Sequence, residues 1–213
     1  MNLQVIDLGR NPYRETWDFQ KELHNKRYHG EIPDTLILVE HPHVYTLGKN
    51  ARENNLVAGT HFLQNKGVEV VNVDRGGDIT YHGPGQIVGY PIFNLRDHDI
   101  GVKKYVDHVE QAMIDTCDEY DIRARRIDGL TGVWVGTNKV AAIGIRVSKW
   151  TTYHGFALNV ETDLSLFTGI IPCGIVDKGV TRMKDLNPAA TVEKVKKVVI
   201  GKFQKIFEFD EIL

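Results

Sequence analysis

The sequence has few of the features that mark secreted, membrane-spanning or nucleic-acid-binding proteins. Its two cysteines, Cys117 and Cys173, are too few for a disulfide framework, so we expect a protein of the reducing cytoplasm. No apolar run approaches the roughly 18 residues that a membrane span needs, and the N-terminal residues lack the basic start and apolar stretch of a signal peptide. The formal net charge of −2 argues against a nucleic-acid partner.

What the chain does contain is ordinary globular composition, with 42% hydrophobic and 25% charged residues. No repeat or low-complexity linker divides it, so we expect one domain over residues 1–213. Apolar runs predict strands at 3–8, 35–40, 44–48, 68–73, 86–93, 123–127, 132–135, 140–147 and 153–160. Helical spacing predicts helices over 12–29, 102–120 and 192–206, with one helical turn at 163–167. Strands in hairpins with helices at intervals predict an α/β or α+β fold with a mixed sheet.

The most unusual stretch runs from Arg75 to Gln86 and reads RGGDITYHGPGQ. Glycine lets the backbone take positive φ and approach a ligand closely, whereas each glycine weakens a packed strand. We therefore expect a loop or hairpin corner shaped around a ligand, entered by the strand at 68–73 and left by a return strand at 86–93. The stretch lacks both common nucleotide-loop patterns, so phosphate binding is not indicated.

Two residues elsewhere are candidates for chemistry. Cys173 lies between Pro172 and Gly174, which disfavour regular structure, so its thiol is either an exposed nucleophile or a small buried hydrophobe. Lys139 follows a predicted turn, and it is either a solvated lysine or a cation that lowers the pKa of a nearby thiol and moves protons. Cys117, by contrast, falls in the apolar stripe of a predicted helix, which indicates packing.

The histidines leave a further alternative open. His82 and His154 could join Cys173 in a zinc site or a Cys/His nucleophile–base pair, or they could be hydrogen-bonded scaffolding. His41 and His43 carry the same ambiguity. Because no short fixed ligand spacing is present, we predict no metal.

Together these segments resemble one family. The Arg75–Gln86 stretch is similar to the signature of the lipoyl(octanoyl) transferases, the octanoyl-[acyl carrier protein]–protein transferases of lipoate biosynthesis. The resemblance continues in chain order through 40–42, 45–48, 132–134, 139–144, Trp150, Thr152, 154–160 and 171–174. Two departures are visible: His43 stands where a second proline is usual, and Arg182 where a serine is usual. Both are expected on the rim where protein partners dock.

The resemblance implies a biotin/lipoate-protein-ligase-like fold, with a mixed, mostly antiparallel sheet flanked by helices. It implies a catalytic pair, Cys173 and Lys139, and no cofactor. The implied substrate-binding residues lie in three segments: Arg75, Gly76, Gly77, Asp78, Ile79, Thr80, Tyr81 and His82; Ala142, Ile143 and Gly144; and Gly155, Phe156 and Ala157.

The implied reaction moves an octanoyl group from octanoyl-acyl carrier protein to a lysine of lipoyl domains, through an acyl-cysteine thioester, as the first step of endogenous protein lipoylation. The implied acceptors are the lipoyl domains of 2-oxoacid dehydrogenase E2 subunits and the glycine cleavage H protein. Small residues at 144, 155 and 157 are expected to leave an apolar channel, with Ile143 and Phe156 as walls. Three alternatives are an ATP-dependent lipoate–protein ligase of the same fold, an octanoyl amidotransferase, and a non-catalytic lipoyl-domain binder.

Carrier and lipoyl domains of such a system are expected to be acidic. Two basic groups are therefore candidate docking patches: Arg123, Arg125 and Arg126, and Lys194, Lys196 and Lys197 on the final helix. A solvated charged face is the simpler interpretation, above all for the lysines. No heptad pattern or exposed apolar helix face stands out, so we expect a monomer.

Overall fold

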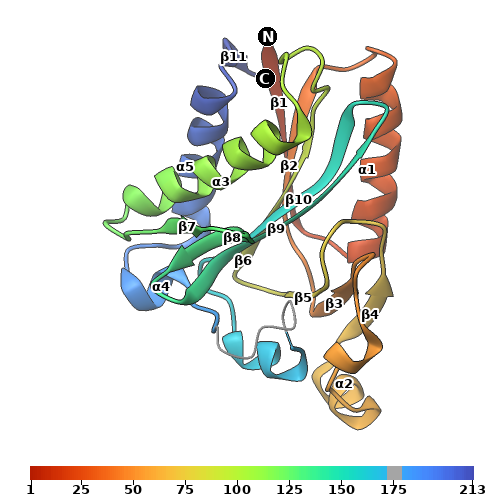
Figure 1. Cartoon of the computed structure of the whole chain (residues 1–213), viewed down its shortest axis with the longest axis vertical. Coiled ribbons are helices and arrows are strands. Elements are labelled where there is room, and N and C mark those ends of the chain that lie inside the picture. The colour runs from red at the N-terminus through yellow and green to blue at the C-terminus, as the bar shows by residue number, and fades with distance from the viewer. Residues whose placement is uncertain (172–178) are drawn as a thin grey trace.

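The computed structural model describes residues 1–171 and 179–213. Within these residues, a central eight-stranded sheet has the order β11-β1-β2-β6-β10-β9-β8-β7 (Figure 1). Its strands are β1 (Asn2–Arg10), β2 (Asp34–Glu40), β6 (Gln86–Ile92), β7 (Arg125–Ile127), β8 (Leu130–Val135), β9 (Asn138–Ser148), β10 (Thr151–Asn159) and β11 (Glu211–Ile212). β1 runs parallel to β2 and β11, and the remaining neighbours are antiparallel. The predicted mixed, mostly antiparallel sheet is confirmed.

Helices cover both faces of this sheet. α1 (Tyr13–Tyr28) packs on one face, and α3 (Val102–Asp118) and α5 (Val192–Ile206) pack together on the other (Figure 1). The apolar run of β2 serves both layers, because its side chains alternate. Leu36 and Leu38 join the core under α3 and α5, whereas Ile37 and Val39 join the core under α1. No helix among the described residues has the length and apolar character needed to cross a bilayer.

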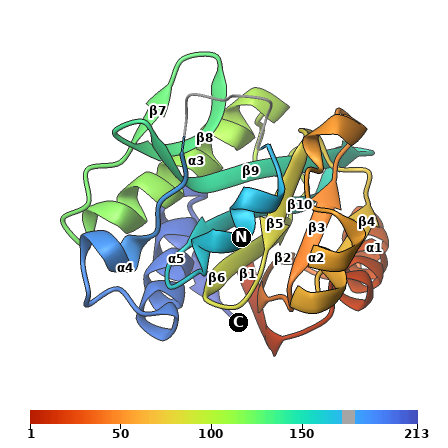
Figure 2. The same ribbon diagram turned by 90° about the horizontal axis from the view of Figure 1, so that it is seen from below.

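A second, three-stranded sheet lies beside the end of α1 (Figure 2). Its order is β4 (Glu69–Asn72), β3 (Val44–Leu47) and β5 (Ile79–His82). The short helices α2 (Thr60–Lys66), η1 (Glu53–Asn55) and η2 (Leu164–Gly169) surround it, and α4 (Met183–Leu186) precedes α5. Tyr45, Tyr81 and Leu166 lie in its small core. The sequence patterns did not predict α2.

The glycine-rich stretch differs from the expected loop or hairpin corner. Its glycine-free middle is strand β5, which pairs with β3, and β6 does not return along β5 but enters the large sheet between β2 and β10. Ile79 and Tyr81 alternate into the core of the small sheet, so four residues suffice for a strand. Glycines flank this strand on both sides: Gly76 and Gly77 lie in the connection from β4, and Gly83 and Gly85 lie where the chain passes to β6 of the large sheet.

The first helix starts one residue later than predicted, whereas α5 starts as predicted but is capped by a different group. Pro12 is the N-cap of α1 instead of its first helical residue, and the side chain of Asn11 donates a 3.0 Å hydrogen bond to the Thr16 hydroxyl. Thr191 precedes α5 as predicted but makes no side-chain cap bond. The Val192 amide donates instead to the Glu161 carboxylate at 3.0 Å, so a distant acidic side chain caps this helix.

Candidate active site

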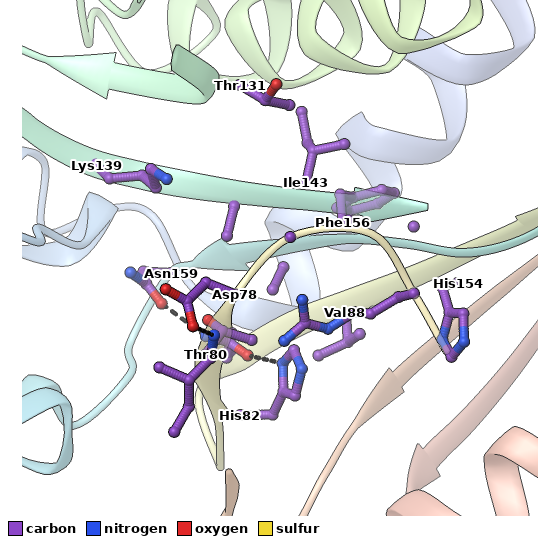
Figure 3. Close-up of a pocket in the computed structure, with 18 of the residues that line it drawn as sticks. Asp78, Thr80, His82, Val88, Thr131, Lys139, Ile143, His154, Phe156 and Asn159 are labelled. Carbon is purple, nitrogen blue, oxygen red and sulfur yellow. Dashed lines mark hydrogen bonds between the residues drawn. The ribbon is translucent and has the colours of Figure 1, made fainter. Parts of the chain in front are cut away.

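A cavity of about 290 Å³ lies between the Arg75–His82 segment and the β9–β10 strand pair (Figure 3). Ala142 and Gly144 share one face of β9, because strand side chains alternate. Their partners across the sheet are Ala157 and Gly155 on β10, which share the same face. Four small residues therefore form one patch of cavity wall.

The glycines in this patch permit close approach of backbone. The Gly76 amide donates a 2.9 Å hydrogen bond to the Ile145 carbonyl, which fixes the Arg75–His82 segment over β9. A Cβ on Gly144 would lie 3.0 Å from the Gly76 carbonyl, and a Cβ on Gly155 would collide with the Gly89 carbonyl of β6. Both glycines are required by neighbouring backbone, a reason different from the empty channel expected from the sequence.

All but two of the predicted substrate-binding residues line this cavity. The wall includes Arg75, Gly77, Asp78, Ile79, Thr80, His82, Ala142, Ile143, Gly144, Gly155, Phe156 and Ala157. Gly76 and Tyr81 are not part of it. Tyr81 is turned toward the small sheet, where its hydroxyl bonds to His43 Nδ1 at 2.8 Å and its ring packs on Phe167.

The structure adds wall residues that the sequence reasoning did not assign. They come from elements distant in the chain: Tyr13, Gln86, Val88, Tyr90, Gly129, Leu130, Thr131, His154, Asn159, Phe167 and Val180. Gln86, His154 and Asn159 lie in segments that carry the family resemblance, and His154 was also considered as a ligand.

Lys139 lies near one end of the cavity (Figure 3). It is the second residue of β9 and pairs with Trp134 of β8. Its amide donates to the Gly179 carbonyl at 2.9 Å, and its carbonyl accepts from the Thr181 amide at 3.0 Å. The ammonium nitrogen lies 4.7 Å from the centroid of the Trp134 ring. The backbone and the side chain of Lys139 are both held.

Cys173 lies outside the described residues, but the chain on either side of its segment is anchored at the cavity. The Ile171 amide donates a 2.8 Å hydrogen bond to the Asn55 carbonyl. After the segment, Gly179 bonds to Lys139 as described above. Cys117 is fully buried in α3, where burial raises the pKa of its thiol to about 12, which fits the predicted packing role.

Asp78 is the one carboxylate among the described residues that line the cavity. Asn55 Nδ2 donates to its Oδ2 at 2.6 Å, and the Ile79 amide donates to its Oδ1 at 2.7 Å. These two bonds fix the carboxylate group on the wall. Asp78 therefore offers an oriented negative charge in a cavity that also contains Lys139.

Arg75 has a scaffolding role in addition to its place in the wall. Its Nη2 donates to the Thr46 carbonyl at 2.7 Å and to the Thr46 hydroxyl at 2.9 Å, and its Nη1 donates to the Gly76 carbonyl at 2.9 Å. The guanidinium thus ties the glycine-rich segment to β3 of the small sheet. We expect this tie to set the height of the cavity above β9.

A chain of hydrogen bonds connects residues of the wall. His82 Nδ1 bonds to Gln86 Oε1 at 2.8 Å, and Gln86 Nε2 donates to Asn159 Oδ1 at 2.9 Å. Asn159 Nδ2 then donates to the Thr181 carbonyl at 3.1 Å, next to the bond that Thr181 makes with Lys139. Burial lowers the pKa of His82 well below its usual value, so this imidazole is neutral.

His154 lies at the end of the cavity opposite Lys139 (Figure 3). Its φ of +56° is rare for a residue with a side chain and marks local strain. His154 Nε2 bonds to Asp74 Oδ1 at 2.8 Å, and burial lowers the pKa of the imidazole. His41 bonds to the Tyr90 hydroxyl at 2.8 Å, and burial lowers its pKa to about 4.

These histidines are scaffold groups in the part of the chain that the structure describes. Within residues 1–171 and 179–213, no three His, Cys, Asp or Glu side chains are grouped to hold a metal ion. His82 of β5 bonds to Gln86 of β6, His154 of β10 bonds to Asp74, and His41 bonds to Tyr90 of β6. These bonds fit the scaffolding alternative, whereas a pairing of His82 or His154 with Cys173 involves a residue outside the described part of the chain and stays open.

The two departures from the family pattern also have structural partners. His43 holds the Tyr81 hydroxyl, as above. Arg182 donates through Nη1 to the Thr162 carbonyl and through Nε to the Asp185 carboxylate, both at 2.9 Å. Both side chains thus contact neighbouring segments of the same chain.

Some residues of the candidate docking patches form ion pairs with carboxylates of the same chain. Arg126 contacts the Glu110 carboxylate at 2.9 Å, and Lys196 contacts that of Asp7 at 2.9 Å. Arg123 and Arg125 are exposed on and before the edge strand β7. A docking role therefore remains a hypothesis for these two arginines.

Comparison with known proteins places this site in a family context. Residues 12–204 match the family described as the lipoyl protein ligase A/B catalytic domain. An octanoyltransferase of Alkaliphilus metalliredigens is 49% identical over 214 residues, covering 100% of this chain and 98% of that protein. An octanoyltransferase of Solibacter usitatus is 50% identical, covering 98% and 94%.

Solved structures show the same fold at low identity. The bipartite lipoate protein ligase of Thermoplasma acidophilum has a TM-score of 0.74 at 14% identity, covering 100% of this chain and 86% of that one. A lipoate-protein ligase A bound with ATP has a TM-score of 0.76 at 14% identity, covering 100% and 90%. The biotin protein ligase of Aquifex aeolicus reaches 0.57 at 12% identity, covering 98% and 71%. The predicted ligase-like fold is confirmed.

Proposed function

The chain belongs to the lipoyl protein ligase A/B catalytic-domain family, and we propose that it moves an octanoyl group from an acyl-carrier thioester to a lysine of a lipoyl domain. It is an acyltransferase that acts in protein lipoylation. The observation that carries the proposal is one cavity with apolar walls, with Lys139 at one end and the flanks of the Cys173 segment anchored beside it.

The cavity walls suit a medium-length acyl chain. The small patch at 142, 144, 155 and 157 forms part of the cavity wall, and Ile79 and Val88 add apolar surface to it. At about 0.8 kcal/mol per buried CH₂, burial of an octanoyl chain contributes roughly 5 kcal/mol before the cost of ordering it. That gain applies to the acyl donor and to the acyl-enzyme alike, so it holds the chain in place through both steps.

In the first step, the Cys173 thiolate attacks the carbonyl carbon of the octanoyl thioester. A C–S bond to Cys173 forms, and the C–S bond to the carrier breaks. The Lys139 ammonium stabilises the attacking thiolate by its charge and then gives a proton to the departing carrier thiolate. The products are acyl-Cys173, a free carrier thiol and a neutral Lys139 amine.

In the second step, the acceptor lysine attacks acyl-Cys173 as a neutral amine. The C–N bond forms, the C–S bond breaks, and the neutral Lys139 takes up the proton that the acceptor nitrogen loses. The thiolate and the Lys139 ammonium are thereby restored. Because a thioester becomes an amide, the step is downhill and requires no nucleotide.

Both steps develop negative charge on the acyl oxygen, which needs hydrogen-bond donors. The Gly76 amide already donates to the Ile145 carbonyl, so it is not available as a donor to the acyl oxygen. Gly77 lies in the cavity wall with φ of +86°. We propose its amide as one donor, together with the backbone around Cys173.

We further propose acyl carrier protein as donor, and lipoyl domains of 2-oxoacid dehydrogenase E2 subunits and of the glycine cleavage H protein as acceptors. The relatives support octanoyl transfer through their names, and one structural neighbour was solved as a ligase with its E2 lipoyl domain. Arg123 and Arg125 are the exposed cations we propose for docking an acidic partner. Reversing both charges should raise the KM for octanoyl-carrier protein, and an unchanged KM would remove them from the interface.

The decisive test is intact mass after incubation with octanoyl-acyl carrier protein. We expect one octanoyl adduct on the wild-type chain, none on Cys173→Ala, and discharge of the adduct on adding a lipoyl domain. Cys117→Ala is the matched control, because its thiol is buried in α3. If Cys173→Ala still gains the adduct and still octanoylates the lipoyl domain, the mechanism is wrong.

The same assay separates the alternatives of this fold. An ATP-dependent ligase would octanoylate the lipoyl domain from free octanoate and ATP. An amidotransferase would use an octanoylated lipoyl domain as donor and ignore the acyl-carrier protein. A non-catalytic binder would form no adduct at all.

A further inference from the structure

The side chain of Lys139 lies against strand β8. Gly132 of β8 has φ of +127°, and a Cβ placed there would lie 3.1 Å from Lys139 Cε and 2.9 Å from the Ala141 carbonyl oxygen. The aliphatic stem of Lys139 therefore occupies space that only glycine leaves open. This fixes the direction in which the side chain leaves β9.

The ammonium group at the end of that stem lies over an indole ring. The Lys139 nitrogen is 4.7 Å from the Trp134 ring centroid, within the range of a cation–π contact. Trp134 is only 2% exposed, so its ring is fixed within β8, whereas Lys139 is half-buried. Tryptophan is the side chain whose face attracts cations most strongly, and it attracts the ammonium form over the neutral amine.

We infer that Trp134 is a positioning residue for the reaction: its ring face holds the Lys139 ammonium at the cavity and stabilises the charged form. Lysine is a flexible chain whose rotamer freedom is costly to remove, so a catalytic lysine needs a partner that fixes it. An aromatic ring fixes the ammonium without adding an opposite charge. A carboxylate partner would fix it too, but its negative charge would offset that of the ammonium. Gly132 provides the space in which the stem lies.

Other charged or titratable groups line the same cavity or lie on neighbouring strands in the part of the chain that the structure describes. Asp78 and Arg75 line the same cavity from the segment before β5, together with His82 and His154, both kept neutral by burial. In the sheet, Trp134 of β8 lies between Lys139 of β9 and Arg125 of β7, which are its partners on the two neighbouring strands. A change confined to the indole ring leaves all of these groups unaltered.

What the ring contributes to catalysis rests on the proposed function. There the ammonium stabilises the Cys173 thiolate in the first step. If Trp134 favours the ammonium, weakening the ring lets Lys139 lose its proton at lower pH and makes the Cys173 thiol ionise less readily. The contact itself is tested separately, through the reactivity of the Lys139 amine.

The first experiment weakens the ring without changing its shape. All three tryptophans are replaced by tetrafluorotryptophan during expression, and amines are labelled with a trace of acetic anhydride across a pH series. Only neutral amines react, so the pH of half-maximal labelling reports the charge state. We expect this midpoint to fall for Lys139 in the fluorinated protein, relative to exposed Lys194, as read by peptide mass spectrometry.

The second experiment uses single variants of the unlabelled protein. Trp134→Leu should lower the Lys139 labelling midpoint by about 0.4 to 1.5 pH units, and Trp134→Phe by less. Trp150→Leu is the control, because Trp150 lies exposed in the β9–β10 turn. If Trp134→Leu does not fold, Trp134→Phe and the fluorinated protein give the same test. An unmoved Lys139 midpoint in folded, fluorinated protein overturns the inference.

Alkylation of Cys173 against pH is read on the same samples. A higher alkylation midpoint in Trp134→Phe, with the Lys139 midpoint lowered, supports both the inference and the proposed mechanism. A lowered Lys139 midpoint with unchanged Cys173 alkylation supports the Trp134 contact and removes Lys139 from the thiol chemistry. Reduced activity with neither midpoint moved means that Trp134 only stabilises the fold, which overturns the inference.

Discussion

The two ends of the cavity are built from different chemical groups. At the inner end, Tyr13, Tyr90, His82 and His154 are almost fully buried, and burial keeps both imidazoles neutral. At the outer end, the side chains that line the wall include Lys139, Asp78 and Thr131, which are half-buried or exposed. The inner end is fixed, its imidazoles are neutral, and the buried Arg75 guanidinium near them is held by hydrogen bonds to Thr46, whereas the outer end holds charged groups near solvent.

This difference follows from the cost of burying charge. A charged group deep in the fold requires a paired partner or changes its protonation state, as the histidines do. Charge that must appear and disappear during a reaction is less costly near the surface. The inner end can therefore shape and hold an acyl chain, while proton transfer takes place at the outer end.

The largest expected effect is at the outer end. Lys139→Met keeps a flexible, unbranched side chain but removes the charge and the proton, so transfer should fall about 10²- to 10⁴-fold. Stability should change little, because Lys139 is half-buried. Single-turnover transfer and urea unfolding measure the two, with Lys194→Met as control. A rate within tenfold of wild type would show that the charge and proton of Lys139 at the outer end are not needed for transfer.

The next largest effect is expected at the inner end, on the free energy of unfolding. Gln86 is 1% exposed and bonds to His82 and Asn159. Gln86→Leu leaves both partners unsatisfied and should lower the free energy of unfolding by about 2 to 3 kcal/mol, measured in urea. Exposed Gln64→Leu should change it by less than about 0.5 kcal/mol. If Gln86→Leu instead stops transfer in fully folded protein, the inner end takes part in the chemistry.

A smaller effect tests the wall between the two ends. Ala157 faces Ala142 in the small-residue patch, so Ala157→Val should shorten the space for the acyl chain. We expect the ratio of octanoyl to hexanoyl transfer to fall about tenfold, since one or two CH₂ groups lose their burial. Competing donors and mass spectrometry of the lipoyl domain give this ratio. Ala189→Val, at an exposed position, should leave it unchanged.

The smallest effect concerns the support of His154. Burial raises the pKa of Asp74, but hydrogen bonds from His154 and Tyr153 outweigh it and hold that pKa well below its usual range. The folded-state pKa is thus below the unfolded value of about 3.9, so the stabilisation is present above that pH and lost as pH falls below it. Asp74→Asn should cost about 1 kcal/mol at about pH 7, allowing for screening of a part-exposed group.

The difference between wild type and Asp74→Asn should be smaller at about pH 3 and should fall further at lower pH, because the unfolded carboxyl then binds a proton while the native one still resists it. Urea midpoints at the two pH values measure this. Asp128→Asn, in the exposed turn before β8, is the control with the same change in charge. An equal loss at both pH values would show that Asp74 contributes packing instead of charge.

Much of the fold could be predicted from the sequence because local pattern decides it. The continuous apolar run of β2 and the stripe of α3 each have one compatible structure, and both were correct. The glycine-rich segment was harder, since its four-residue strand β5 depends on pairing with β3. Nothing local to Ile79–His82 indicates that partner.

The site residues also fall into two groups, those marked by local sequence and those placed by contacts with distant segments. Small residues at 142, 144, 155 and 157 could be assigned from the resemblance, and all line the cavity. Tyr13 and Tyr90 could not, because their place in the wall results from packing of α1 and β6 against the sheet. The carboxylate of Asp78 lay within a predicted segment, yet its orientation depends on Asn55, which no motif marks. The pairing of Cys173 with Lys139 stays a prediction.

The β9–β10 hairpin has a consequence for how the molecule folds. A two-residue turn, Lys149 and Trp150, joins its strands with both residues at positive φ. Hairpins of this kind form within about 1 to 10 µs, long before distant segments meet. We therefore expect this wall of the cavity to form locally, with Gly144 opposite Gly155, before the glycine-rich segment packs onto it.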